Sequence, residues 1–286
     1  MNQYLNLLLL CLLLNITNVG FADQKFDLAV CAIFQDDAKY LPEWIDFHDD
    51  QGVQHFYLYN NLSSDDFETI LNPYIKRGLV TLIDWPYPQK DLVDWNGIQC
   101  NAYMDCIQRI SDNVTWCAFI DTDEFLFCPN GSKLPIFLKN FIKFGAVGAN
   151  WMLYGTSNVL IIPNGKKMID FLVLRAKDSH KRHFHVKSIV QPKLVKRCFN
   201  PHFFWFDDKA FTVTENKIRF DGPFSPTISM NHIRINHYWS RDKQFFDEVK
   251  CARQTKWGFS CDKVISEEKE LNDIYDPLSN YIKFKK

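Results

Sequence analysis

A cluster of acidic residues follows an apolar run near the middle of the chain. Residues 116–120 are Trp, Cys, Ala, Phe and Ile, a run typical of a buried strand in a parallel sheet. The run ends at Asp121, Thr122, Asp123 and Glu124. Three carboxylates at the end of a buried strand need compensation, because desolvating a charge is costly. A divalent cation such as Mn²⁺ or Mg²⁺ would compensate them and would also hold a substrate phosphate.

An Asp-x-Asp pair is a weak signal by itself, since many such pairs are solvated turns. The pattern disfavours an EF-hand, because Phe125 occupies the next ligand position and the required Gly and Glu are missing. It also disfavours an aspartic protease, because no Gly follows Asp121-Thr122 and no second copy exists. The acids follow a strand, and ligands of open α/β sheets bind at the carboxyl ends of strands, which favours the metal site.

The composition is that of a folded globular protein. The chain has 286 residues, of which 47% are hydrophobic and 15% aromatic, so a sizeable core forms and wholesale disorder is excluded. The net charge of −1 gives no indication of nucleic-acid binding. No linker rich in Gly, Pro or Ser is visible, which predicts one continuous domain over residues 23–286.

The N-terminus has the pattern of a targeting segment. Residues 5–14 are almost all Leu, and Gly20 and Ala22 are small residues at the cleavage positions, which predicts a signal peptide over residues 1–22. The alternative is an uncleaved anchor, but polar residues interrupt the run and a span needs about 20 apolar residues. We therefore expect an exported protein, extracellular, periplasmic or lumenal, without a stable membrane span. A retained leader would make it membrane-anchored.

The cysteines indicate no structural zinc site, because no CxxC pair exists. Cys31 and Cys117 fall in predicted buried strands, where Cys commonly acts as a small hydrophobic residue. Cys251 and Cys261 lie at the polar C-terminal end and are the better disulfide candidates in an exported protein.

The first half of the chain alternates predicted strands and helices. Strands are predicted at residues 28–34, 55–59, 79–83 and 116–120, and helices from Leu41 and at residues 67–75 and 98–110. This alternation predicts an α/β fold with a Rossmann-like, doubly wound, mostly parallel sheet. No GxGxxG loop is present, so a nicotinamide or flavin site is not supported.

The second half has a different pattern. Strands are predicted at residues 147–154, 171–174, 189–195 and 233–236, with few helices between them. A helix capped by Ser240 is predicted to run to about Gln254. This half therefore adds a mixed part to the parallel sheet.

Four separated segments resemble glycosyltransferase family 92 and the related family 2-like glycosyltransferases. They are residues 35–45 with His48, residues 55–65, residues 116–126, and residues 187–192 with residues 236–240. The resemblance implies a GT-A fold of the Asp-x-Asp type, a nucleoside-diphosphate sugar donor and a divalent metal, commonly Mn²⁺. It implies a nucleotide-sugar half over residues 23–130 and an acceptor half with the C-terminal helices over residues 131–286. One departure is that Gln35-Asp36-Asp37 stands where the family usually has Lys-Asn-Glu, so Asp37 keeps the carboxylate.

The resemblance also implies a metal site. Asp123 is the expected direct ligand, and Asp121 is expected to meet the metal or the ribose. His237 is expected to complete the metal shell, since a C-terminal His often does so in GT-A enzymes and imidazole accepts Mn²⁺. The alternative for His237 is a core histidine bonded to the backbone, with His202 as the competing ligand.

The residues expected to bind the nucleotide sugar are Asp37, Asn61, Asp65, Asp121 and Lys187. Lys187 could reach the diphosphate as a point charge. The loop over residues 61–65 leaves the end of a strand, where a base or ribose could bind, and its alternative is an ordinary Asx-rich turn.

The acceptor side is less well defined. Trp151 and Tyr154 could stack on a sugar face, and core packing accounts for them equally well. No residue stands out as the catalytic base. The candidate acids are Asp207, Asp208, Glu215 and Asp221.

These observations predict a metal-dependent hexosyltransferase. It would move a sugar from a nucleoside-diphosphate sugar to a glycan or other hydroxyl acceptor, and inversion is expected on the resemblance alone. One alternative is a non-catalytic secreted carbohydrate-binding protein that retains the fold. Another is a metal-dependent phosphodiesterase, although such enzymes generally need His and Asp ligands spread over several strand ends.

Overall fold

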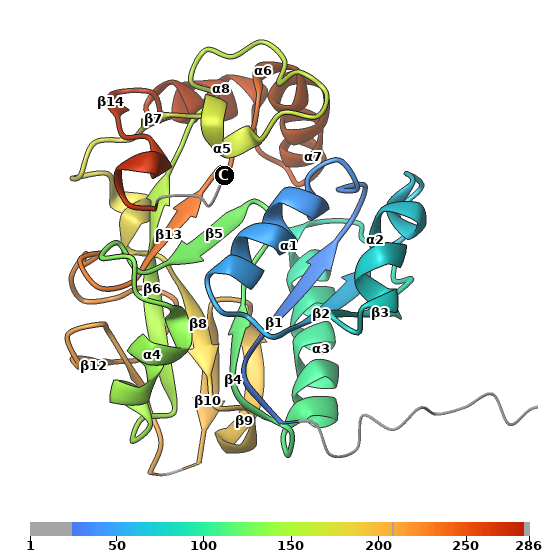
Figure 1. Cartoon of the computed structure of the whole chain (residues 1–286). Coiled ribbons are helices and arrows are strands. Elements are labelled where there is room, and N and C mark those ends of the chain that lie inside the picture. The colour runs from blue at the N-terminus through green and yellow to red at the C-terminus, as the bar shows by residue number, and fades with distance from the viewer. Residues whose placement is uncertain (1–24, 208, 283–286) are drawn as a thin grey trace, which may run out of the picture.

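The computed structural model describes residues 25–207 and 209–282 of the chain (Figure 1). The predicted signal peptide, its cleavage site after Ala22 and the acid Asp208 lie outside these residues. None of the helices in this described part of the chain is long and apolar enough to cross a membrane.

The first half folds into parallel strands joined by helices, as predicted. The strands are β1 (Phe26–Phe34), β2 (His55–Asn60), β3 (Val80–Asp84) and β4 (Val114–Phe119), and the helices are α1 (Leu41–Asp50), α2 (Phe67–Lys76) and α3 (Leu92–Ile110). β1 lies between β2 and β4 and is parallel to both. α3 begins at Leu92 rather than at Ile98, because Asp91 caps it by accepting a hydrogen bond from the backbone N–H of Asp94.

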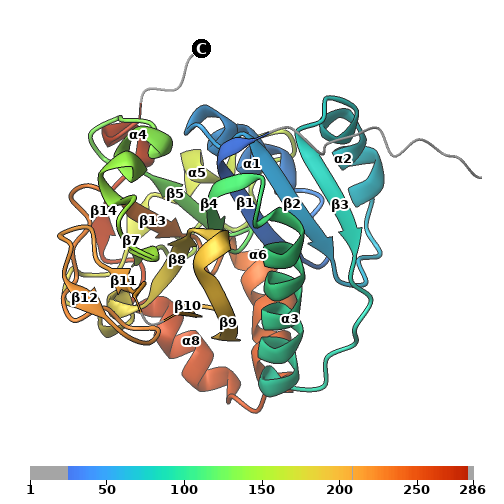
Figure 2. The same cartoon turned by 90° about the horizontal axis from the view of Figure 1, so that it is seen from below.

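The sheet separates two apolar cores. Val30 and Phe34 of β1 pack with α1 and α2, whereas Ala29, Cys31 and Ile33 pack with α3. Figure 2 shows α1 and α2 on one side of these strands and α3 on the other. Because successive side chains of a strand point to opposite faces, a strand buried on both faces must be apolar throughout. Cys31 therefore acts as a core residue, as predicted.

The second half contributes short strands and short helices. The strands are β5 (Glu124–Phe127), β6 (Ala146–Leu153), β7 (Leu174–Arg175), β8 (Val186–Val190), β9 (Val195–Asn200), β10 (Phe203–Phe206), β11 (Thr212–Val213), β12 (Arg219–Phe220), β13 (Arg234–His237) and β14 (Ile274–Tyr275). The helices are α4 (Leu134–Leu138), α5 (Met168–Phe171), α6 (Lys243–Phe245), α7 (Cys251–Lys256) and α8 (Cys261–Lys269). A π-helical turn, Phe246–Lys250, joins α6 to α7.

The two halves share one mixed sheet. Within the described residues its main path runs β12-β11-β6-β8-β4-β1-β2-β3, and β13 joins it by pairing with β6 and β5. β8 is antiparallel to both β4 and β6, so it links the parallel part to the mixed part. The predicted class, α/β with a mostly parallel core and a mixed C-terminal part, is confirmed. In Figure 1 the helices α6 to α8 lie above the carboxyl ends of β1 and β2.

Three predicted elements of the second half were wrong. Residues 171–174 form the end of α5 and the start of β7 rather than one strand. The strand predicted at residues 189–195 is divided between β8 and β9, because Pro192 cannot donate to a sheet ladder and starts a 3₁₀ turn. The C-terminal helix is capped by Asp242, whose carboxylate accepts from the backbone N–H of Phe245, and not by Ser240.

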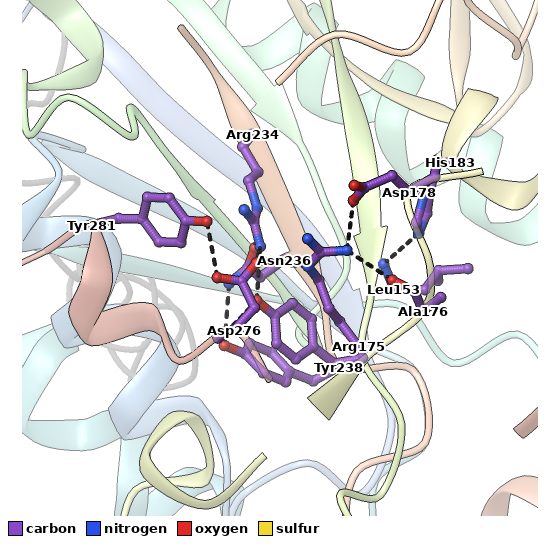
Figure 3. A network of polar contacts seen from close by, with 11 residues as sticks. Leu153, Arg175, Ala176, Asp178, His183, Arg234, Asn236, Tyr238, Asp276 and Tyr281 are labelled. Carbon is purple, nitrogen blue, oxygen red and sulfur yellow. Dashed lines mark hydrogen bonds and ion pairs between the residues drawn. The ribbon is translucent and has the colours of Figure 1, made fainter. Parts of the chain in front are cut away.

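A buried polar network attaches the C-terminal segment to the sheet (Figure 3). The carboxylate of Asp276 accepts from Nη2 of Arg234 at 2.8 Å, from Nε of Arg175 at 2.7 Å and from the hydroxyl of Tyr281 at 2.9 Å. The hydroxyl of Tyr154 donates to the backbone oxygen of Asp276 at 2.8 Å. Burial by itself raises the pKa of Asp276, but Arg234 and these hydrogen bonds outweigh it and hold the pKa below its usual range.

We predict that Asp276→Ala destabilises the protein by about 3–5 kcal/mol, because it leaves Arg234 buried without its counter-ion. The matched control is Asp178→Ala, which removes the exposed partner of the same Arg175 and should cost about 0–1 kcal/mol. Urea unfolding of both variants measures the difference. The folded-state pKa of Asp276 is lowered, so this stability is present above the unfolded pKa of about 3.9 and is lost as the pH falls through the folded pKa. Equal losses for the two variants at pH 7 would contradict the prediction.

Candidate active site

The acidic turn lies at the carboxyl edge of the parallel strands. It follows β4 and leads directly into β5, which pairs antiparallel with β13. The register places His237 opposite Glu124, and the backbone N–H of Tyr238 donates to the backbone oxygen of Asp123 at 2.8 Å. Backbone pairing therefore carries His237 to the acidic turn from the far end of the chain. β5 was not predicted, because a strand of four residues is too short to show a measurable period.

Asp123 and His237 form the centre of the site. Nε2 of His237 lies 3.3 Å from Oδ1 of Asp123, and Nζ of Lys250 lies 3.5 Å from Oδ2. Burial by itself raises the pKa of Asp123, but His237 and Lys250 outweigh it and hold the pKa below its usual range. Burial also lowers the pKa of His237, which favours a neutral ring with a lone pair for a ligand.

The geometry of this pair fits a divalent cation. Oxygen ligands stand about 2.0–2.1 Å from Mg²⁺, so neighbouring ligands of an octahedral ion are about 3 Å apart, close to the observed Asp123–His237 separation. The second ring nitrogen of His237, Nδ1, lies 3.9 Å from Oε1 of Glu124, and both atoms are buried without a hydrogen-bond partner in the described part of the chain. A carboxylate behind a ligating histidine is the usual supporting arrangement at metal sites.

Asp121 has partners other than this pair. Its carboxylate forms an ion pair with Nζ of Lys187 at 2.9 Å and accepts a hydrogen bond from Nε2 of Gln99 at 2.7 Å. Across residues 25–207 and 209–282, no three His, Cys, Asp or Glu side chains converge on a single metal position. The structure thus brings together Asp123 and His237 of the three expected ligands, and the charge of Asp121 is compensated by a lysine.

Lys187 does not occupy the position expected of a diphosphate contact. Its side chain is buried behind the acidic turn, with Nζ also 3.8 Å from Oε2 of Glu124. Burial by itself lowers the pKa of Lys187, but Asp121 and Glu124 outweigh it and raise the pKa above its ordinary value. Burial raises the pKa of Glu124. Contrary to the prediction, Lys187 does not line the cavity, and it instead neutralises the charge of the acidic turn.

A cavity of about 240 Å³ opens over Asp121, Thr122 and Asp123. Its wall combines the end of β1, the start of α3, the turn between β9 and β10, and the C-terminal helices. Trp151 lines it, with its ring centre 4.4 Å from that of His237. His202 also lines it, but its Nδ1 lies 2.8 Å from the backbone oxygen of Val186, so it is tied to the core.

Asp37 connects the N-terminal and C-terminal walls of the cavity. Its carboxylate accepts from the hydroxyl of Thr122 at 2.6 Å and pairs with Nη1 of Arg241 at 2.5 Å. The guanidinium of Arg241 also lies over the ring of Tyr40, 3.9 Å from its centre. The predicted residue Asp37 is therefore at the site. Its partner Arg241 was missed, because an isolated arginine after a strand carries no signal.

Three other predicted residues lie away from the cavity. Asn61 donates through Nδ2 to the backbone oxygens of Trp85 and Tyr87 at 2.8 and 2.9 Å, so it holds the segment after β3. Asp65 accepts from the backbone N–H of Ala38 at 2.7 Å and orders the loop before α1. Tyr154 is buried in the network around Asp276 and cannot stack on a sugar in the cavity.

The three candidate acids that the structure describes also lie away from the cavity. Asp207 pairs with Lys196 on the surface, and Asp221 is exposed. Glu215 accepts from the backbone N–H groups of residues 231–233 at 2.8–2.9 Å and orders that loop. The carboxylates that line the cavity, within the described ranges, are those of Asp37, Asp121 and Asp123.

The fold and the site define an α/β protein with a cavity at the carboxyl edge of its parallel strands, where an acidic turn meets a histidine. Residues 26–268 match the family model of glycosyltransferase family 92, and the chain belongs to this family. The predicted family is thereby confirmed.

Two relatives illustrate the match. The chain is 31% identical over 179 residues to a glycosyltransferase family 92 protein of Oryza sativa subsp. japonica, covering 61% of this chain and 28% of that protein. It is 31% identical over 107 residues to the β-1,4-galactosyltransferase galt-1 of Caenorhabditis elegans, covering 36% of this chain and 25% of that enzyme. The chain thus spans less than a third of the length of these relatives. Among solved structures, the match to S. aureus TarS 1–349 covers 85% of this chain and 71% of the TarS chain, with 9% identity and a TM-score of 0.40.

We predict that Lys187→Met destabilises the fold by about 3–5 kcal/mol, because Asp121 and Glu124 would lose their buried cation. Lys196→Met is the matched control. It breaks an ion pair whose two partners are both exposed and should cost about 0–1 kcal/mol. Denaturant unfolding compares the two, and a Lys187→Met variant as stable as the control would contradict the compensating role.

Proposed function

We propose that the chain is a metal-dependent glycosyltransferase that moves a hexose from a nucleoside-diphosphate sugar to a hydroxyl group of a glycan. The observation that carries the proposal is the Asp123–His237 pair, held by strand pairing at a cavity that both halves of the sheet enclose. Such a pair suits a divalent cation, and Mn²⁺ accepts both carboxylate and imidazole ligands. Inversion is proposed from the family resemblance.

The chemistry requires a leaving diphosphate to be stabilised and an acceptor to be oriented. A bound Mn²⁺ or Mg²⁺ would neutralise the charge that develops on the leaving diphosphate. Asp123 and His237 would hold the ion, and Glu124 would orient the histidine through Nδ1. Asp37 and Arg241 would hold the acidic turn in place, and Trp151 would form an apolar wall beside it.

The donor and the compartment are part of the proposal. Two relatives are named as β-1,4-galactosyltransferases, one from Caenorhabditis elegans and one acting on galactan in Arabidopsis thaliana, so galactose is the sugar to test first. The apolar leader supports action in the secretory pathway. A metal-dependent phosphodiesterase is less well supported, because the described residues bring together one pair of ligands and not several.

We predict that Asp123→Ala abolishes Mn²⁺ binding and the Mn²⁺-dependent part of UDP or GDP binding, with an unchanged far-UV circular dichroism spectrum. His237→Ala should weaken Mn²⁺ binding by roughly 10–100-fold, the scale seen when support of a metal site is lost. Isothermal titration calorimetry with Mn²⁺, with each nucleotide, and with both together measures these effects.

Asp112→Ala removes an exposed acid in the turn after α3, is the control for loss of a carboxylate and should change neither affinity. Transfer from a UDP-sugar to a glycan acceptor, assayed with the same variants, separates an enzyme from a non-catalytic binding protein. Undiminished nucleotide affinity in Asp123→Ala, or in a chelator, would refute the metal site.

A further inference from the structure

Positive side chains gather on the wall of the cavity that faces the acidic turn. Lys250 ends the π-helical turn, Arg253 lies on α7, and Arg182 lies in the 3₁₀ helix Lys181–Phe184. All three line the same cavity as Asp121 and Asp123. Elements far apart in the sequence therefore place cations around one small space.

The acids of the cavity do not balance these cations. Arg241 forms an ion pair with the carboxylate of Asp37, and Lys187 forms one with that of Asp121. Asp123 is shared between His237 and Lys250. Each acid that lines the cavity therefore has a partner other than Arg253 or Arg182.

Arg253 is the cation that is left over. Within residues 25–207 and 209–282, this half-buried guanidinium makes no hydrogen bond or ion pair, whereas Arg182 has a partner in Glu267 at 3.6 Å. A partly desolvated cation without a counter-ion is costly, so the arrangement is suited to an anion that enters the cavity. Burial lowers the pKa of Arg253, with the carboxylate of Asp37 opposing it, which is consistent with a missing partner.

A divalent ion would increase this excess of positive charge. An ion bound by Asp123 would take the counter-charge that Lys250 now uses, and would add two positive charges of its own. The ligand must then carry at least two negative charges, and a diphosphate supplies them with oxygens that accept well from guanidinium groups.

We propose that Arg253, with Lys250 and Arg182, binds the diphosphate of the donor directly, and that this contact retains part of the nucleotide affinity when no divalent ion is bound. The proposal rests on the proposed function and adds to it a second source of diphosphate recognition, contributed by the C-terminal helices. Arg253 is the residue that distinguishes it, because Lys250 and Arg182 also have partners within the protein.

The test compares UDP and GDP with their nucleosides by titration calorimetry, with Mn²⁺ and with EDTA. The wild type should bind either UDP or GDP in EDTA. The affinity should be lower than with Mn²⁺, yet at least about tenfold higher than that for the corresponding nucleoside. Arg253→Met should lower the diphosphate affinity roughly tenfold or more in both conditions and leave nucleoside binding unchanged. Arg253→Lys should fall between the two, because it keeps the charge and loses the forked geometry.

Arg109→Met removes an exposed arginine on α3 that pairs with Asp105 and does not line the cavity, and it should behave as the wild type. Equal affinity for diphosphate and nucleoside in EDTA would overturn the inference, as would normal diphosphate binding by Arg253→Met, and both would leave the proposed function standing. A wild type that binds neither diphosphate even with Mn²⁺ would overturn the proposed function and this inference together.

A second inference rests on a separate observation, the pair Cys251 and Cys261. The two thiols are free, and their Sγ atoms lie 2.9 Å apart, closer than an ordinary non-bonded contact of two sulfurs. Cys251 begins α7 and is buried, while Cys261 begins α8 and is exposed. The segment between them carries Arg253 and Trp257 into the cavity wall.

We infer that Cys251 and Cys261 form a disulfide that fixes this segment. In exchange with oxidised glutathione, the exposed thiolate of Cys261 attacks the glutathione disulfide and releases one reduced glutathione. The thiolate of Cys251 then displaces the second glutathione, so two thiols lose two protons and two electrons and one protein disulfide forms. Closing the loop restricts the unfolded chain more than the folded one.

We predict that oxidised glutathione raises the melting temperature of the wild type by on the order of 5–10 °C relative to the dithiothreitol-reduced protein. Cys251→Ser and Cys261→Ser should each remove the difference, and Cys128→Ser, a buried cysteine outside the pair, should keep it. Peptide mapping after alkylation should find residues 251 and 261 linked. Full alkylation of both cysteines after oxidation, or a temperature shift that survives in Cys261→Ser, would overturn the inference.

Discussion

The structure depends on how the buried acids between β4 and β5 are compensated. The three acids find their partners on two strands that lie later in the chain. Lys187 of β8 reaches Asp121 and Glu124 from beneath, and His237 of β13 reaches Asp123 from the side. Because an unpaired buried carboxylate is strongly destabilising, the second half must fold back over the first for the acidic turn to exist.

The two aspartates of the turn have different environments, and this difference suggests how the site works. Asp121 is tied to a lysine that is buried and does not line the cavity. Asp123 faces the cavity, where its partners are a histidine and a lysine that also line it. The Asp121–Lys187 ion pair supports the turn, and in the proposed function a bound cation would replace one of the partners of Asp123. The cations of α7 would then be available to a diphosphate, which connects the C-terminal helices to donor binding.

The elements that were predicted well have strong local signals. The strands up to β4 are long apolar runs, and α2 and α3 have a regular apolar period, so burial on one or both faces can be read directly. Local rules failed where a competing residue decided the outcome. Pro192 divides a predicted strand, and Asp242 caps the helix that Ser240 was expected to cap. β5 was not predicted, because a four-residue strand is specified by its pairing with β13 and hardly by its own sequence.

The sequence by itself determined the α/β class, the family, and the placement of the acids at the end of a buried strand, because these follow from apolar periodicity and short contiguous motifs. It also indicated Asp37 and His237 as members of the site. Only the tertiary structure decided that Asp121 pairs with Lys187, that Arg241 holds Asp37, and that Asn61 and Tyr154 lie outside the cavity. These are contacts between residues far apart in the chain. They depend on strand order and on which charges lie close enough to pair, and neither quantity is a local property of the sequence.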